Sequence, residues 1–136
     1  MASGASAWVA AHIARDAPVL ATSPLLVVVV LLVVAAAFRA LIPNMSGFLA
    51  TTIPLAMSVG AATGANPLVC GLAATIAGDA VLYYPAQSAS SLVVYERGHL
   101  SVPEIFRFGV WMTVLAGLVV LIVAVPYWIA IGFPLR

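Results

Sequence analysis

The sequence predicts an all-α integral membrane protein built from a helical hairpin, one broken transmembrane helix and one full transmembrane helix. The first observation is composition: 65% of the 136 residues are hydrophobic, 7% are charged, and the mean hydropathy is +1.21. These values lie far outside those of soluble globular domains. The second is charge spacing, because the four longest uncharged intervals contain 22, 39, 16 and 28 residues. A crossing of the hydrocarbon core needs about 20 residues, so three intervals are each long enough for one or two crossings.

The same composition excludes several classes of function. There is no lysine, and five arginines nearly balance four acids, so no basic field is present to recruit nucleic acid. The single cysteine, Cys70, excludes an intrachain disulfide and leaves no metal-ligand cluster. An intramembrane aspartyl protease needs two facing acids, and Asp16, the only aspartate besides Asp79, lies outside the membrane runs. Ser88 and His99 have no supporting catalytic motif, so we predict no enzyme and no cofactor beyond a coupling ion.

Residues 1–18 are expected to form a short arm helix that lies along the membrane interface. They lack the positive n-region of a secretory signal peptide. The segment sets an apolar group against a small polar one, namely Trp8, Val9 and Ile13 against His12, Arg15 and Asp16. Such a pattern is typical of an interfacial helix. The alternative is that Met1 begins a fragment and that further chain precedes these residues.

Residues 22–62 are expected to form the helical hairpin that begins the membrane domain, 19–136. Pro24 suits the first turn of a helix and opens an apolar run that extends to about Ile42. The turn residues PNMSG, 43–47, then separate this arm from a second apolar one. The residues themselves leave two alternatives open: a surface loop between two crossings, or the tip of a re-entrant hairpin.

Residues 66–96 are expected to form one broken helix. Asn66 and Pro67 provide an N-cap and a first helical position, and the helix is predicted to continue to Pro85. A continuous helix of about 30 residues would measure roughly 45 Å, which is too long for one crossing and too short for two. The polar stretch AQSASS follows Pro85, so the length predicts that the chain unwinds at 85–91 and then resumes as a half-helix.

The last transmembrane helix is expected at 104–132. Gly98 predicts the end of the half-helix, and Ser101 with Glu104 has the spacing of a capping box before the next apolar run. This run is long enough to span the membrane with some tilt.

The polar break carries the candidate site. Transporters use half-helix N-termini to bind anions and unwound carbonyls to bind Na⁺, and broken helices at bilayer depth line cavities. Hydroxyls of Ser88, Ser90 and Ser91 would donate to a carboxylate or sulfate, and the 43–47 turn would add polar groups from the opposite side. Asp79 is the only acid within a long apolar run, so it is a candidate coupling residue. The alternatives are an interfacial loop for AQSASS and a structural partner for Asp79.

The order of these segments resembles a known family. PNMSGFLATTIPLA is followed by GANPLV, by a small-residue helix into YYPAQSASSLVVYERG, and by a helix after VPEIFRFG. This order is similar to the C-terminal portion of the divalent anion:Na⁺ symporters, the dicarboxylate, citrate and sulfate carriers of the ion-transporter superfamily. The resemblance covers nearly the whole chain and implies a re-entrant hairpin and a broken helix that form part of one inverted repeat.

Aligning Pro54 and Pro85 on the family's prolines implies the site residues. The hairpin tip then has Asn-Met-Ser, 44–46, where the family has Ser-Asn-Thr, and the second loop has Ser-Ala-Ser-Ser, 88–91, without the family's further prolines and asparagine. By this resemblance the substrate is expected to bind Asn44, Ser46, Ser88, Ser90 and Ser91. Na⁺, the expected metal ion, would bind carbonyl and hydroxyl oxygens of Asn44, Met45, Gly47, Ala86, Gln87 and Ser88.

The resemblance implies secondary active transport, namely Na⁺-coupled symport of a small divalent anion, a dicarboxylate or sulfate, by alternating access. The family's other inverted repeat has no counterpart here, so the chain is expected to be the C-terminal part of a carrier or a split subunit. Its expected partners are the missing N-terminal half or a partner subunit, a second copy in a homodimer, and the lipid of the plasma or inner membrane. Two alternatives stay open: a small structural or assembly subunit, and a proton-coupled anion permease that uses Asp79.

Overall fold

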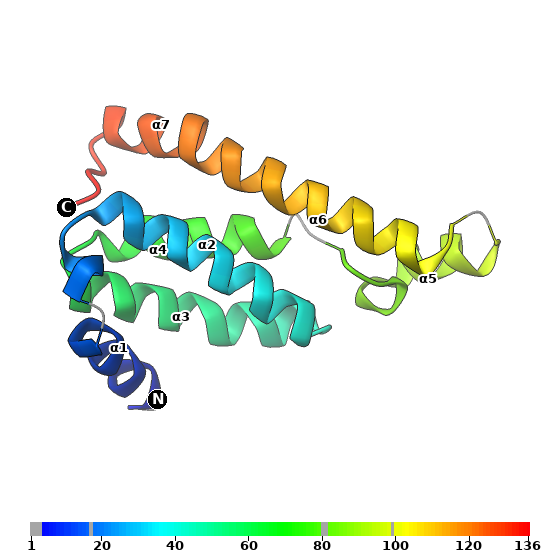
Figure 1. Ribbon diagram of the computed structural model, residues 1–136, viewed down its shortest axis with the longest axis horizontal. Helices are drawn as coiled ribbons and strands as arrows, with labels where there is room; N and C mark the ends of the chain where they lie inside the picture. The colour runs from blue at the N-terminus through cyan, green and yellow to red at the C-terminus, as the bar shows by residue number, and fades with distance from the viewer. Residues whose placement is uncertain (1–3, 17, 80–81, 99) are drawn as a thin grey trace.

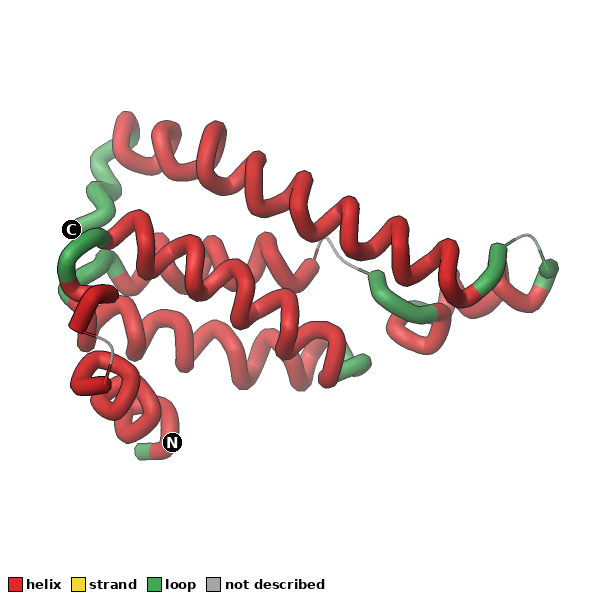
Figure 2. The backbone as a smooth tube through the Cα atoms, viewed as in Figure 1, coloured by secondary structure: helices red, strands yellow, loops and turns green. Residues whose placement is uncertain are grey.

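The computed structural model describes residues 4–16, 18–79, 82–98 and 100–136, and every regular element in these ranges is helical. The predicted all-α class is therefore confirmed. The elements, shown in Figures 1 and 2, are α1 (Ala5–Asp16), η1 (Pro18–Ala21), α2 (Pro24–Leu41), α3 (Met45–Thr63), α4 (Pro67–Asp79), η2 (Pro85–Gln87), α5 (Ala89–Glu96), α6 (Val102–Val119), η3 (Val120–Ala124) and α7 (Val125–Ala130). Residues 1–3 and 17 of the expected arm helix and 80–81 of the expected broken helix lie outside the described residues.

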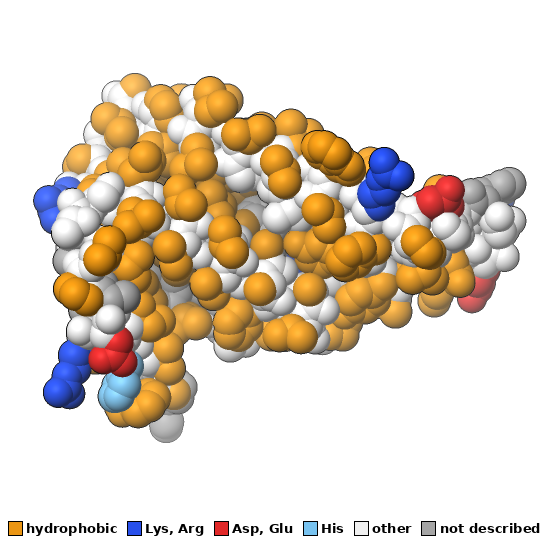
Figure 3. Space-filling model, in the orientation of Figure 1, with side chains coloured by type: hydrophobic (Ala, Val, Ile, Leu, Met, Phe, Trp, Pro, Cys, Tyr) orange, Lys and Arg blue, Asp and Glu red, His pale blue; other side chains and the backbone are white. Residues whose placement is uncertain are grey.

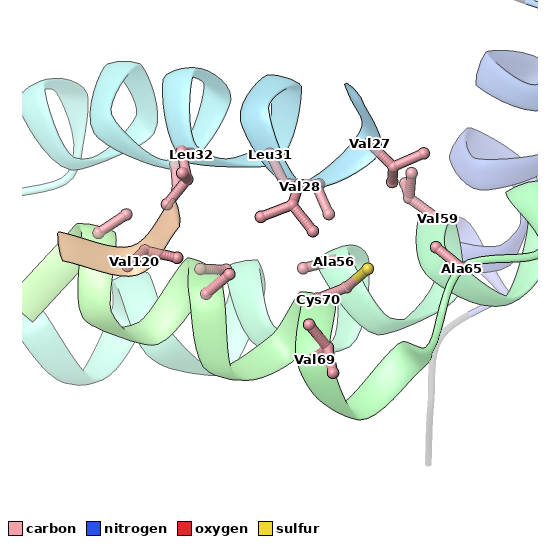
Figure 4. Close-up of a cluster of buried hydrophobic side chains, with 14 of the residues drawn as sticks. Val27, Val28, Leu31, Leu32, Ala56, Val59, Ala65, Val69, Cys70 and Val120 are labelled. Atoms are coloured by element: carbon pink, nitrogen blue, oxygen red, sulfur yellow. The ribbon is translucent and has the colours of Figure 1, made fainter. Parts of the chain in front are cut away.

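Helices α2 and α3 form the hairpin, and α4 packs against both of them while α1 lies against α3 (Figure 1). α2 begins at Pro24, as predicted, and α3 is capped by Gly64, whose φ of 78° suits a residue without Cβ. The core between the three helices includes Val27, Val28, Leu31, Ala56, Val59, Val69 and Cys70 (Figure 4). Lipid tails are as apolar as this core, so close fit of side chains stabilises the bundle.

Glycines on α3 and α4 let these two helices approach closely. A Cβ at Gly60 would lie 2.8 Å from the Cys70 sulfur, and a Cβ at Gly78 would overlap the ring of Phe48. Phe48 is fully buried, so its ring rests directly on the bare backbone near the end of α4. Small residues at these positions therefore serve close helix packing.

Helix ends follow the capping signals in the sequence. At the start of α4, Asn66 Oδ1 accepts a hydrogen bond from the Leu68 N–H, with N···O 3.0 Å. At the start of α6, the backbone N and the Oγ of Ser101 donate to Glu104 Oε2 at 2.8 and 2.6 Å. Gly98, with φ 74°, follows the end of α5. These predicted boundaries are confirmed.

Helices α6 and α7 form one long helix that contains the π-helical turn η3. Its residues Val120, Val125 and Trp128 are buried. In a regular α-helix each residue advances by about 100°, so positions five apart lie about 140° from each other. A π turn instead stacks residues five apart. It therefore brings these three side chains onto the face toward the bundle.

Among the described residues, three helical spans are long and apolar enough to cross a membrane, and these are Pro24–Leu41, Met45–Thr63 and Val102–Ala130. In the view of Figure 3, hydrophobic side chains cover the middle of the molecule and charged side chains lie toward its two ends. This distribution matches a hydrocarbon core between two polar interfaces. The chain is an integral membrane protein.

Candidate functional site

The broken helix is interrupted earlier than the sequence predicts. α4 ends at Asp79 and not at Pro85. One reason is Gln87, whose Oε1 accepts hydrogen bonds from the backbone N–H groups of Tyr83 and Tyr84. In a continuous helix these N–H groups would donate to carbonyls four residues earlier. The Gln87 side chain thus satisfies the backbone N–H groups of Tyr83 and Tyr84, just before η2.

The same side chain joins the break to the hairpin. Gln87 Nε2 donates to the backbone carbonyl of Arg39, with N···O 2.7 Å. This carbonyl has no helical partner, because the residue four positions later is Pro43, which lacks an N–H. Gln87 is buried, so it satisfies a buried acceptor that would otherwise cost free energy.

Arg39 is 3% exposed, and its guanidinium bridges the ends of two helices. Nε donates to the Gly78 carbonyl in α4 at 3.1 Å, and Nη1 donates to the carbonyls of Ile42 and Pro43 at 2.8 and 2.9 Å. Backbone acceptors at helix C-termini lack intrahelical partners and carry partial negative charge. The guanidinium carbon also lies 5.9 Å from the centre of the Phe48 ring. These contacts hold the cation in one orientation.

A pocket of about 290 Å³ opens beside these contacts, and it is lined by Arg39, Met45, Asp79, Leu82, Gln87 and Ser88. Met45 is the first residue of α3, and Ser88 directly precedes α5. Two helix N-termini therefore border the pocket, and such termini carry partial positive charge. The hairpin tip and the break meet in this one cavity.

Four of the residues predicted for the site line this pocket, and they are Met45, Asp79, Gln87 and Ser88. The other predicted residues are not among its lining residues, and they are Asn44, Ser46, Gly47, Ala86, Ser90 and Ser91. The structure therefore brings together side chains from the tip, from the end of α4 and from the break, and it leaves part of each predicted set outside the cavity.

The local structure explains where the remaining residues lie. Asn44 caps α3, because its Oδ1 accepts from the N–H groups two and three residues later at 2.9 and 3.3 Å. The prediction that the chain is unwound as far as residue 91 is wrong, since α5 begins at Ala89 and contains Ser90 and Ser91. Ser90 still reaches the break, because its Oγ lies 2.8 Å from Ser88 Oγ.

The break lies beside the long helix and not beyond its end. Tyr83 Oη and Thr113 Oγ1 are 2.7 Å apart, and a Cβ at Gly109 would overlap the Leu82 carbonyl oxygen. Gly109 stands seven positions after the start of the span Val102–Ala130, about 10 Å along a helix of about 43 Å. The break therefore lies beside a helix that is long and apolar enough to cross a membrane, and unwound backbone at membrane depth occurs in protein-lined cavities.

Arg39 is a pocket residue that the sequence-based site prediction missed. A signal was present, because Arg39 is the only charged residue between Asp16 and Asp79. An ionisable residue within a membrane run indicates a functional position. Pro43, four positions later, also indicates a carbonyl that needs a partner from elsewhere in the chain. Leu82, which also lines the pocket, has no comparable signal.

The chemistry of the pocket suits small ions. The described residues contain no group of three or more His, Cys, Asp or Glu that could hold a metal ion. Instead, the Asp79 carboxylate, the Ser88 hydroxyl and unwound backbone offer oxygen ligands of the kind that bind Na⁺ in broken helices. Arg39 and the two helix N-termini would attract an anion. His99 lies outside the described residues.

A pocket with charged and polar side chains at the meeting point of a hairpin tip and a broken membrane helix is typical of secondary transporters. The family profile described as the sodium:sulfate symporter transmembrane region matches residues 1–133, and the chain belongs to this family. The family expected from the sequence resemblance is therefore confirmed. No curated protein and no solved structure matches the chain.

Proposed function

We propose that the chain forms part of a carrier that couples Na⁺ movement to transport of a small divalent anion, sulfate or a dicarboxylate, by alternating access. The pocket supports this proposal, because Met45 of the hairpin tip and Gln87 and Ser88 of the break line one cavity. The proposal includes a re-entrant hairpin, since a tip that shares a cavity with the break lies at the depth of the break.

The anion is proposed to bind between the N-termini of α3 and α5. Met45 and Ser88 stand at these two termini and line the pocket, and helix N-termini carry partial positive charge that attracts anions. The Ser88 hydroxyl would donate to the anion, and its partner Ser90 would hold it in position. Asn44 and Ser46 flank Met45 and would contribute from the tip. Ser91, also predicted to bind the substrate, lies in the first turn of α5 and would contribute to anion binding from there.

Na⁺ is proposed to bind at oxygens next to the anion, with the Asp79 carboxylate and the oxygens near Gln87 and Ser88 as ligands. Charge at membrane depth is costly when it is alone. An anion and a cation that bind side by side reduce this cost for each other, so each raises the affinity for the other. This mutual dependence is the physical basis of the proposed coupling.

The direct test is uptake of radiolabelled sulfate and succinate by the full protein in proteoliposomes, with a Na⁺ gradient and with choline in its place. We expect uptake of one of the two anions, and we expect it to be stimulated by Na⁺. Absence of uptake of either anion under both conditions, in vesicles that contain correctly inserted protein, would contradict the proposal.

Ser88→Ala tests the site itself. Removing one hydrogen bond to a charged ligand should raise the KM for the transported anion about tenfold or more, because Ser88 lines the pocket. Ser58→Ala is the matched control, since the Ser58 hydroxyl donates to the Pro54 carbonyl within α3. An unchanged KM in Ser88→Ala, with normal membrane insertion of both variants, would contradict the assignment of Ser88 to the anion-binding site.

A proton-coupled permease is a second candidate function, and the position of Asp79 in the pocket favours it. A carboxylate that takes up and releases a proton would then replace Na⁺ as the coupling site. In this case uptake should follow the pH gradient and ignore Na⁺, and Asp79→Asn should abolish the pH dependence. Stimulation by Na⁺ at constant pH would reject this candidate.

A further inference from the structure

The buried charge of Arg39 has no counter-ion among the described residues. Its hydrogen bonds go to three neutral carbonyls, and no carboxylate of the described chain lies within 4.0 Å of its nitrogens. Nη2 has no hydrogen-bond partner in the described part of the chain, and Arg39 lines the pocket. A buried charge without a counter-ion is costly. The charge of Arg39 and the N–H groups of its Nη2 are therefore available to an anion in the pocket.

We infer that Arg39 is the fixed counter-charge for the divalent anion and that it allows the pocket to hold this anion in the absence of Na⁺. The inference rests on the proposed function. The guanidinium suits the ligand class, because its Nη2 keeps two N–H donors that can form charge-assisted hydrogen bonds to the oxygens of a sulfate or carboxylate. The three carbonyl contacts already fix its orientation, so little conformational freedom is lost when the anion binds.

Asp79 provides a comparison within the same cavity. It lines the pocket with Arg39 but is exposed, and it carries the opposite charge. Its carboxylate would repel an anion that binds the guanidinium. Neutralising either residue should therefore change sodium-free anion affinity, and the two changes should have opposite signs.

The experiment measures equilibrium binding of radiolabelled sulfate and succinate to the full protein in nanodiscs, with Na⁺ and with choline in its place. The wild-type protein is expected to bind one of these anions without Na⁺. In sodium-free buffer, Arg39→Gln should raise the dissociation constant about tenfold or more, and Asp79→Asn should lower it roughly fivefold. Arg97→Gln is the control, because Arg97 is exposed at the end of α5 and does not line the pocket.

Two features of the design separate an anion-binding role from a structural one. Arg39 also ties α2 to α4, so loss of its contacts can reduce the amount of folded protein. A purely structural role predicts fewer binding sites at an unchanged dissociation constant. Arg39→Lys keeps the charge without the planar donors and should give an intermediate dissociation constant, while Asp79→Asn leaves the Arg39 contacts in place.

The outcomes distinguish this inference from the proposed function. Sodium-free binding that is absent from the wild-type protein, or equal dissociation constants for wild type and Arg39→Gln, would overturn the inference. In either case Na⁺-stimulated uptake by the wild type leaves the proposed function standing. A wild-type protein that neither binds nor transports sulfate or succinate under any of these conditions overturns the proposed function and this inference with it.

Discussion

Individual hydrogen bonds hold the two halves of the candidate site together. The Gln87 amide satisfies the Arg39 carbonyl that Pro43 leaves unpaired, and the Arg39 guanidinium satisfies the Gly78 carbonyl near the end of α4. Each side chain therefore pairs backbone groups that regular helix geometry leaves without a partner. Because the groups are buried, removal of either side chain would leave acceptors that no longer reach water.

Thr52, in contrast, is a buried residue whose polar group, Oγ1, lacks a hydrogen-bond partner among the described residues. Thr52→Val removes this unsatisfied hydroxyl and keeps the shape of the side chain. It should therefore raise the free energy of unfolding by about 1 kcal/mol, measured by thermal or denaturant unfolding in detergent.

Thr63→Val is the matched control for this substitution. Both threonines lie in α3 and are 6% exposed, but Thr63 Oγ1 donates to the Val59 carbonyl at 2.8 Å. We expect Thr63→Val to leave stability unchanged or to lower it. Destabilisation by Thr52→Val of the same size as by Thr63→Val would mean that the Thr52 hydroxyl is satisfied.

At the scale of elements, the hairpin and α4 are held in register by close approach. Phe48, in the first turn of α3, lies against Gly78, in the last turn of α4. This contact adjoins the Arg39 hydrogen bond to Gly78, so helix packing and pocket geometry depend on the same backbone. Any shift of α4 along α3 would move the Gly78 carbonyl away from the guanidinium.

Gly78→Ala tests this coupling between packing and pocket. The new Cβ would overlap the Phe48 ring, and overpacking of this kind costs about 1–3 kcal/mol. We expect lower thermal stability and, from the displaced pocket, weaker anion binding. In Gly117→Ala the new Cβ would meet nothing within 4 Å, so stability should be unchanged or slightly higher. Equal behaviour of the two variants would contradict the close fit of Phe48.

Local signals explain which elements could be predicted from sequence. Asn66 and Ser101 mark helix starts through hydrogen bonds to residues a few positions away. Pro24 marks one through its fixed backbone angle at the first helical position. Such local signals are visible in a short window of sequence. The break is different, because the Gln87 side chain that satisfies its backbone is also hydrogen-bonded to Arg39, 48 positions away in the sequence. Its early start could therefore not be read from the length argument alone.

In the candidate site, too, some features could be predicted from local sequence and others depend on the folded structure. Ser88 and the 43–47 turn could be predicted, because polar residues within apolar runs are conspicuous. The choice among neighbouring serines could not be predicted, since it depends on whether the chain is unwound or helical at Ala89. Arg39 was missed because a charge at the end of a membrane helix is usually at an interface, and only the folded hairpin turns it toward the break.

At the scale of the whole molecule, two ends can be distinguished. Asn66 binds the C-terminal tail, since its N and Nδ2 donate to the carbonyls of Leu135 and Pro134 at 2.8 and 2.9 Å. The end of α3, which is the end of the hairpin away from its tip, therefore lies next to the C-terminal tail of the chain. The end of α5 lies at the opposite end of the molecule, beyond the hairpin tip (Figure 1).

Cysteine labelling tests this arrangement and the re-entrant hairpin together. Single cysteines at Glu96 and Phe133, both exposed, should react with a membrane-impermeant maleimide from opposite sides, while buried Cys70 should not react. Ser46→Cys should react more slowly than Glu96→Cys, because a re-entrant tip lies below the surface, and the transported anion should slow it further. Labelling of Ser46→Cys as fast as Glu96→Cys, without protection, would indicate a surface turn.

The π-helical turn Val120–Ala124 holds one residue more than a regular α-helix needs to bring Val120 and Val125 onto the same face. Loss of one residue from this turn would still leave enough chain to cross the bilayer. It would place Val120 and Val125 four positions apart in a regular α-helix, about 40° from each other, so both would stay on the face toward the bundle. Loss of one residue from the regular part of the helix would instead rotate everything after it by about 100° and turn buried side chains toward lipid. The π turn is therefore the part of the long helix that best tolerates a change in residue count.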